Sequence, residues 1–167
     1  MKTIYKAFAI LLILTLGAVS NKVQAQDSGW KSGNSLSVGF PVGNMEIYSH
    51  SIGVYGNFDY NFNKFLTARF DLGWNDFTGP EHTWIDQTGK SHTEHPSMSV
   101  WEFTTGLRAR VSVFYMEARG GYYTGVNHWG ITPAIGLRLG KFDIQANFNI
   151  AQDYHWGGIR LAYYYGG

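Results

Sequence analysis

Charged and apolar residues occupy opposite phases of a two-residue repeat along most of this chain. In one segment Arg69 and Asp71 alternate with Phe70 and Leu72, and similar alternation recurs around the other arginines of the second half. Successive side chains of a strand point to opposite faces, so this period predicts strands with one charged face and one apolar face. The pattern is typical of a barrel with a charged inside and an apolar outside.

The first 25 residues have the organisation of a signal peptide. Lys2 and Lys6 precede an uncharged run over residues 7–19, which is too short to span a bilayer as a helix. Val23-Gln24-Ala25 resembles a cleavage site, so we expect a signal peptide at 1–25 and one mature domain at 26–167. A retained N-terminal anchor is the alternative.

The chain has no cysteine, which excludes disulfides, an acylated N-terminal cysteine and cysteine-based metal or nucleophile chemistry.

The charge balance and the composition narrow the class of partner. Lysine and arginine number 13 against 12 aspartates and glutamates, which argues against nucleic acid as a partner. Aromatic residues make up 17% of the chain and glycine occurs 21 times, which is high for a soluble domain. No apolar run after residue 25 is long enough for a transmembrane helix, so strands would have to cross any membrane.

Alternation divides the chain into eight expected strands. They cover residues 35–40, 52–60, 66–74, 101–110, 114–123, 129–139, 142–150 and 159–165. The expected connections alternate between longer loops at 41–50, 75–98, 124–128 and 151–156 and short turns at 61–64, 111–112 and 140–141. This alternation favours an antiparallel up-and-down barrel with both termini on the side of the short turns. The two-residue turn Gly140-Lys141 should place Leu139 opposite Phe142.

Pro133 removes a ladder donor inside the sixth strand, which predicts a bulge or a break in closure there.

The polar phase predicts a filled interior. Eleven charged residues fall on this phase, namely Asp59, Arg69, Asp71, Glu102, Arg108, Arg110, Glu117, Arg119, Arg138, Asp143 and Arg160. An eight-stranded barrel is only wide enough for its own side chains, and a planar guanidinium group can bridge several carboxylates. We therefore expect a structural arginine–carboxylate network that plugs the barrel, with a solvated conducting lumen as the alternative.

These features together resemble the small eight-stranded outer-membrane β-barrels of Gram-negative bacteria, the outer-membrane β-barrel domain family. The resemblance covers residues 33–165 and rests on the signal peptide, the eight alternating strands and the alternating loop lengths. It implies an all-β, eight-stranded antiparallel up-and-down transmembrane barrel in the cell outer membrane, with outer-membrane lipid and the outer-membrane assembly machinery as partners. One departure is that Gly166 and Gly167 follow the terminal aromatic residues Tyr163–Tyr165.

The sequence contains no motif for catalysis, and we expect no cofactor and no metal. The longest loop, residues 75–98, carries His82, His92 and His95, and His92-x-Glu94-His95 resembles a fragment of a metal site. Without a second ligand set at a fixed spacing, a solvated polar loop is the better interpretation. His128 or His155 could serve as a base in lipid hydrolysis, but neither has a serine at a recognisable motif spacing.

The sequence therefore predicts a non-enzymatic outer-membrane barrel whose loops, chiefly residues 75–98, contact an extracellular ligand or partner. One alternative is a soluble exported barrel that binds an apolar molecule, with the apolar phase inside. Another is an outer-membrane enzyme that modifies lipid. Lipid outside is favoured because the charged phase is also rich in small residues and because no lysine lies on an expected strand.

Overall fold

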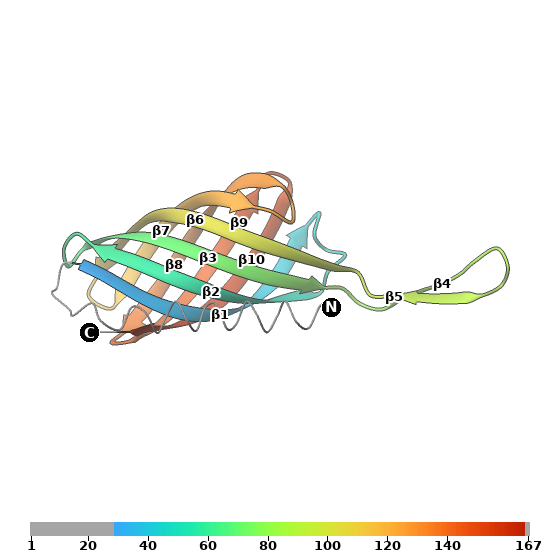
Figure 1. Cartoon of the computed structure of the whole chain (residues 1–167), viewed down its shortest axis with the longest axis horizontal. Coiled ribbons are helices and arrows are strands. Elements are labelled where there is room, and N and C mark those ends of the chain that lie inside the picture. The colour runs from blue at the N-terminus through green and yellow to red at the C-terminus, as the bar shows by residue number, and fades with distance from the viewer. Residues whose placement is uncertain (1–28, 166–167) are drawn as a thin grey trace.

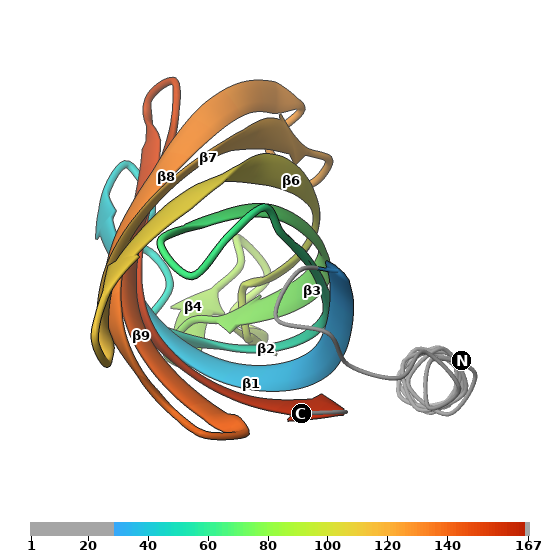
Figure 2. The same ribbon diagram turned by 90° about the vertical axis from the view of Figure 1, so that its left-hand side faces the viewer.

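The computed structural model describes residues 29–165, which form a closed antiparallel barrel of eight strands. The barrel strands are β1 (Gly29–Gly43), β2 (His50–Asn61), β3 (Leu66–Thr78), β6 (Ser97–Val111), β7 (Phe114–Tyr123), β8 (His128–Leu139), β9 (Phe142–Ala151) and β10 (Tyr154–Tyr165). Each strand pairs with its neighbours in this order, and β1 pairs with β10 to close the ring (Figure 2). The predicted eight-stranded up-and-down fold is confirmed, while the signal peptide predicted at 1–25 lies outside the described residues.

A second, two-stranded sheet extends the barrel at one end. It consists of β4 (His82–Ile85) and β5 (Ser91–Glu94), and this hairpin projects beyond the barrel along its long axis (Figure 1). The predicted loop at 75–98 is therefore wrong in extent, because β3 and β6 remain paired as far as Thr78 and Ser97. The strands continue because the period of two persists beyond Trp74, which keeps Phe77 on the inner face.

The two ends of the barrel differ in their connections. Residues 44–49, 79–96, 124–127 and 152–153 lie at the end that carries the hairpin, which we call the loop end, and residues 62–65, 112–113 and 140–141 lie at the opposite turn end. Of the connections at the loop end, only 79–96 is long. The connection before β10 has two residues, because β10 already begins at Tyr154. Leu139 pairs with Phe142 as predicted, across a turn in which Gly140 has a φ of 62°. No helix among the described residues is long and apolar enough to cross a bilayer.

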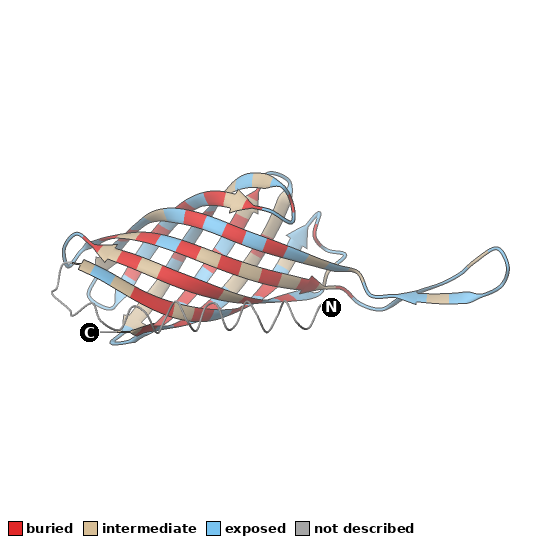
Figure 3. Cartoon of the chain, in the orientation of Figure 1, coloured by how far each residue is buried: buried red, intermediate tan, exposed pale blue. Residues whose placement is uncertain are grey.

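Burial alternates along the strands and shows which phase faces inward (Figure 3). Arg69, Arg108 and Arg160 are each no more than 2% exposed. Every barrel strand instead exposes apolar side chains on the outside, for example Leu36, Ile52, Phe70, Leu107, Met116, Ile135, Ile144 and Leu161. The apolar phase is the outer surface, so the arrangement required by a soluble barrel with an apolar interior is absent from residues 29–165.

Pro133 is accommodated without the predicted bulge or break in closure. The β8–β9 ladder pairs Ile131 with Ile150 and Ala134 with Asn147, which is the same register on both sides of the proline. A bulge would have shifted this register by one residue. The ladder is interrupted only locally, and there the Thr132 hydroxyl donates a hydrogen bond of 2.7 Å to Asn149 Oδ1 inside the barrel. A side-chain contact thus bridges the two strands beside the missing backbone donor.

Candidate functional site

Asp71 on β3 is a centre of the charged interior. Its Oδ1 accepts hydrogen bonds of 2.8 Å from Arg69 Nε and from Asn57 Nδ2. Its Oδ2 contacts Nη1 of Arg119 and accepts a hydrogen bond of 2.6 Å from Nη1 of Arg160. The Asp71 side chain has no exposed surface. Three guanidinium groups from β3, β7 and β10 thus converge on one carboxylate and compensate for its removal from water.

Glu117 on β7 is a second centre, and it shares arginines with the first. Arg108 Nε lies 2.7 Å from its Oε2, and Arg119 Nε lies 2.7 Å from its Oε1. Arg69 Nη1 is 3.5 Å from the Oε2 atom. Arg69 and Arg119 therefore each contact both Glu117 and Asp71. This sharing uses the fork of donors that a guanidinium group presents and that a lysine ammonium lacks.

Two further carboxylates lie closer to the turn end. Asp143 accepts a hydrogen bond of 2.8 Å from Arg108 Nη1 and another from the Tyr115 hydroxyl. Asp59 lies 3.1 Å from Arg138 Nη1 and 3.7 Å from Arg108 Nη1. The guanidinium of Arg108 also lies over the Tyr115 ring, 3.8 Å from its centroid, so its apolar face is covered as well.

Glu102 on β6 completes the set toward the loop end. Its Oε1 accepts a hydrogen bond of 2.5 Å from Asn75 Nδ2, and Arg160 Nη2 lies 4.0 Å from its Oε2. The Arg160 guanidinium lies over the ring of Tyr55, 3.5 Å from the centroid. The charged interior is therefore continuous from Asp59 and Asp143 to Glu102.

Arg110 does not join this interior, although its phase in the sequence predicts it. It lies at the turn end of β6, where its Nε and Nη2 donate hydrogen bonds of 3.3 Å to the Lys64 carbonyl oxygen. Phase alone places a side chain on the inner face, but a residue next to the strand end is already at the rim. The other predicted residues form the charge network: Asp59, Arg69, Asp71, Glu102, Arg108, Glu117, Arg119, Arg138, Asp143 and Arg160. Five arginines meet five carboxylates, so the network is neutral.

An apolar layer closes the barrel between the charge network and the loop end. This apolar cap consists of Met45, Phe77, Val100, Tyr123, Val126, Ala151 and Trp156, and all are buried. The Trp156 ring makes edge-to-face contacts with Phe77 and Tyr123, with centroids 5.6 Å and 5.2 Å apart. Sequence reasoning missed the cap because most of its members fall in the expected loops. The signal was the apolar side chains that continue the inner phase past the ends of those expected strands.

Because the charge network and the apolar cap both occupy the lumen, we expect no steady ion conduction. Reconstituted into planar bilayers, the protein should give no single-channel steps above those of protein-free detergent controls. The physical reason is that an eight-stranded barrel leaves room only for its side chains, and here neutral ion clusters and packed aromatic rings fill that room. Reproducible single-channel steps from folded protein would contradict a plugged interior.

The tip of the β4–β5 hairpin is ordered by Asp86. Its Oδ1 accepts hydrogen bonds from the Thr88 amide at 2.8 Å, the Thr88 hydroxyl at 2.6 Å and the Lys90 amide at 3.0 Å. His92 Nε2 lies 2.9 Å from Asp86 Oδ2, and the His92 ring stacks on Trp84 with centroids 4.6 Å apart. The hydrogen bonds from the Thr88 hydroxyl and from His92 hold the pKa of Asp86 well below its usual range.

We expect the hairpin tip to keep its order in mild acid. A carboxylate with a lowered pKa in the folded protein contributes stability above its ordinary pKa and loses it only as the pH falls through the lowered value. Amide hydrogen exchange at Thr88 and Lys90 should therefore show the same protection at about pH 7 and about pH 4 once corrected for intrinsic rates. Asp86→Ala should remove that protection at both pH values and leave the barrel amides unchanged. Loss of protection in wild-type protein by pH 4 would contradict this role.

The other loop histidines lie along the same hairpin. His82 is paired with Glu94 across the two strands, and His95 Nε2 lies 3.9 Å from Glu81 Oε2. Within residues 29–165, no three histidine, aspartate or glutamate side chains are grouped so that they could hold a metal ion. The arrangement consists of separate acid–histidine contacts along an exposed hairpin.

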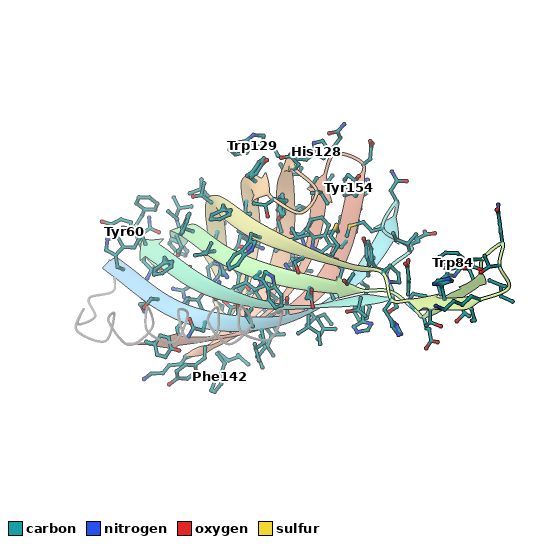
Figure 4. All side chains as sticks on the ribbon, turned by 45° about the vertical axis from the view of Figure 1, so that its right-hand side comes forward. Tyr60, Trp84, His128, Trp129, Phe142 and Tyr154 are labelled. Carbon is teal, nitrogen blue, oxygen red and sulfur yellow. The ribbon has the colours of Figure 1, made fainter. Side chains whose placement is uncertain are left out.

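The two histidines considered as possible bases lie beside aromatic rings. His128 stacks on Tyr154 with centroids 5.9 Å apart (Figure 4). His155 stacks on Phe148 with centroids 6.3 Å apart. Ser49 Oγ is 2.8 Å from His50 Nδ1, and the same hydroxyl lies 2.9 Å from the Thr78 carbonyl oxygen, to which it can donate. These contacts position the side chains of the loop end, and they do not assemble a serine, a histidine and an acid in order.

The comparisons with known proteins support the architecture. No protein-family model matches the chain, and no curated protein matches it. Among solved structures it is similar to a barrel from the de novo design of transmembrane β-barrels, with a TM-score of 0.52 and 13% identity over 85% of this chain and 99% of that chain. It is also similar to Ail, the attachment invasion locus protein of Yersinia pestis, in complex with the heparin analogue sucrose octasulfate, with a TM-score of 0.50 and 12% identity over 83% of this chain and 99% of that chain. At these identities the likeness is one of fold, and the chain has the closed eight-stranded architecture of transmembrane barrels.

Proposed function

We propose that this chain is a non-enzymatic, integral outer-membrane barrel that presents the β4–β5 hairpin to a partner outside the cell. The observation that carries this proposal is the continuous apolar outer surface of a closed barrel whose charges are all turned inward or to its rims. Water would penalise such a surface, whereas the hydrocarbon of a bilayer matches it. A closed barrel also leaves no strand edge with unpaired backbone groups, which lipid could not satisfy.

The dimensions of the barrel support this proposal. A tilted strand needs about 9–11 residues to cross the hydrocarbon core. The barrel strands run from 10 residues in β7 to 15 residues in β1 and β6. The shortest strands therefore cross the bilayer, and the longest ones extend past it at their ends.

Aromatic residues lie at both ends of the outer surface, as the interfacial girdles of membrane barrels do. Toward the turn end, the rings of Trp30 and Tyr60 are 5.1 Å apart and those of Phe142 and Tyr163 are 5.3 Å apart. Toward the loop end, Tyr122 packs against Trp129 at 5.5 Å, and Figure 4 shows Tyr60 and Trp129 on different ends of the barrel. Two such belts are consistent with two interfaces between lipid and water.

The charge network supports a structural role for the interior, and the β4–β5 hairpin supports an interaction outside the barrel. The carboxylates of the charge network each contact at least one arginine, which is what a plug requires. The hairpin, in contrast, stands clear of the barrel and is ordered by its own contacts. We infer that the terminal aromatic segment Tyr163–Tyr165 serves recognition by the outer-membrane assembly machinery and that the loop end faces outward.

Two neighbouring cysteine variants test the orientation of the wall. Val38 is 48% exposed on the outside of β1, and Ser37 is 7% exposed on the inside, so Val38→Cys and Ser37→Cys form a matched pair in a chain without native cysteine. In reconstituted vesicles, a thiol reagent confined to the lipid phase should label Val38→Cys and spare Ser37→Cys. Equal labelling of both, or labelling of Ser37→Cys alone, would refute the proposed lipid-facing surface.

The membrane association itself is tested separately. Produced with its N-terminal segment in a Gram-negative host, the protein should remain in the outer-membrane fraction after washing with urea. The folded and heated forms should also migrate differently in detergent gels, because a closed barrel resists unfolding by detergent. A folded monomer that stays in the aqueous fraction without detergent would overturn the proposal.

A further inference from the structure

A cavity of about 560 Å³ lies where the hairpin leaves the barrel. Glu46, Glu94, His82 and His95 are among the residues that line it, together with Ile47, Pro80 and Pro96. A cavity of this size with a few polar groups on an apolar wall has the dimensions of a binding pocket rather than of a packing defect.

The walls of this cavity are anchored to the barrel. The Gly79 amide donates a hydrogen bond of 2.8 Å to the Pro96 carbonyl oxygen and fixes the base of the hairpin. A side chain at Gly79 would meet the Ile47 carbonyl oxygen at 2.4 Å, so glycine allows β3 to leave close beneath residues 44–49. Tyr48 in that connection packs on Phe77 of the apolar cap, with ring centroids 6.0 Å apart. The two sides of the cavity are thus held at a fixed separation.

Charge at the loop end is strongly one-sided. Within residues 29–165, its acidic side chains outside the charge network are Glu46, Asp76, Glu81, Asp86, Glu94 and Asp153, and Lys90 is its only lysine or arginine. No ion pair of Glu46 or Glu94 occurs in the described part of the chain, although both line the cavity. A cation that enters the cavity would meet two carboxylates with no internal competitor, whereas an anion would be repelled.

We propose that this cavity receives an arginine or lysine side chain of a polypeptide partner. The apolar wall suits the alkyl stem of such a side chain, and the two carboxylates suit its charged head. Trp84 is 44% exposed and follows His82 at a spacing of two, so its ring lies on the same face of the hairpin and can contact the rest of the partner segment. The inference deepens the proposed function, on which it rests for the exposure of the loop end.

The test uses the full barrel in zwitterionic nanodiscs and a capped peptide of alternating glycine and arginine, with binding followed by calorimetry. A peptide with citrulline in place of arginine keeps the shape of the side chain and removes its charge. We expect the arginine peptide to bind at least about tenfold more tightly than the citrulline peptide. Glu46→Gln/Glu94→Gln should weaken arginine binding about tenfold, whereas Asp153→Asn, at the same rim but outside the cavity, should change it less than about twofold.

Each outcome decides the proposal. Equal weakening by Asp153→Asn would show diffuse attraction to an acidic rim and would overturn a defined pocket, as would binding of the citrulline peptide at equal strength. All variants keep the charge network intact, and the gel migration of folded protein checks the barrel. A folded, membrane-inserted barrel that ignores the peptide refutes this inference alone.

Discussion

Replacing Asp71 with asparagine is expected to destabilise the barrel by about 3–5 kcal/mol, because the change leaves buried arginines without their shared counter-charge. Asp71 contacts Arg69, Arg119 and Arg160 and has no exposed surface. The asparagine side chain has nearly the same shape, so the effect isolates the charge. The five arginines of the network would then face four carboxylates inside the barrel.

The measurement is the urea midpoint of the folded, fast-migrating band of protein reconstituted in vesicles, converted to a free energy of unfolding with the slope of the wild type. Asp153→Asn removes an exposed carboxylate in a turn and should change the free energy by less than about 1 kcal/mol. Asp71→Asn/Arg160→Gln restores charge balance, so its loss should be smaller than the sum of the two single losses by about 1 kcal/mol or more. Additive losses, or a single loss as small as that of the control, would contradict a coupled network.

Trp156→Ala is expected to cost about 3–5 kcal/mol, because it removes the largest side chain of the apolar cap and leaves a cavity that fixed strands cannot collapse to fill. Trp156 is 2% exposed and contacts Phe77 and Tyr123 edge to face. The matched control is Trp129→Ala, since Trp129 is 76% exposed on the outer surface of β8. In the same urea assay the control should lose less than about 1.5 kcal/mol, the worth of an aromatic contact such as that with Tyr122.

The two predictions separate the two layers of the interior. Trp156→Phe keeps an aromatic ring and should lose less free energy of unfolding than Trp156→Ala. At position 71, in contrast, no neutral side chain should restore stability unless an arginine is also changed. Equal losses for Trp156→Ala and Trp129→Ala would show that the cap does not pack as a core. An apolar layer and an ionic layer therefore respond to different kinds of substitution.

The sequence predicted the strands and the inner phase because both follow from local alternation. Arg69 and Arg108 are buried as the alternation indicates, and Phe70 and Leu107 are exposed. The turn at Gly140 was also predictable, since a two-residue connection fixes which side chains become opposite neighbours. What alternation cannot supply is the partner across the lumen: Asp71 meets Arg160 although 89 residues separate them in the chain.

The features that the sequence did not predict depend on where strands stop. Met45 and Trp156 lie in segments expected to be loops, and they turn inward because the barrel continues far enough to cover them. The segment between Thr78 and Ser97 contains turn-forming and strand-forming residues in nearly equal numbers. Its hairpin was therefore not distinguishable from a loop. The prediction that Arg110 lies in the interior differs from the structure for the converse reason. β6 ends at Val111, so the lumen does not enclose the Arg110 side chain.

The positions of the network along the chain have a consequence for the order in which the barrel assembles. Asp71 lies on β3 and one of its three arginines lies on β10, the last strand, which closes the ring against β1. Until that pairing forms, the carboxylate lacks the third of its three arginines and the ring remains open between β1 and β10. Charge compensation is therefore completed only with the final strand. A chain truncated before β10 would lack Arg160, so the ionic core stabilises the closed ring over any shorter, open set of strands.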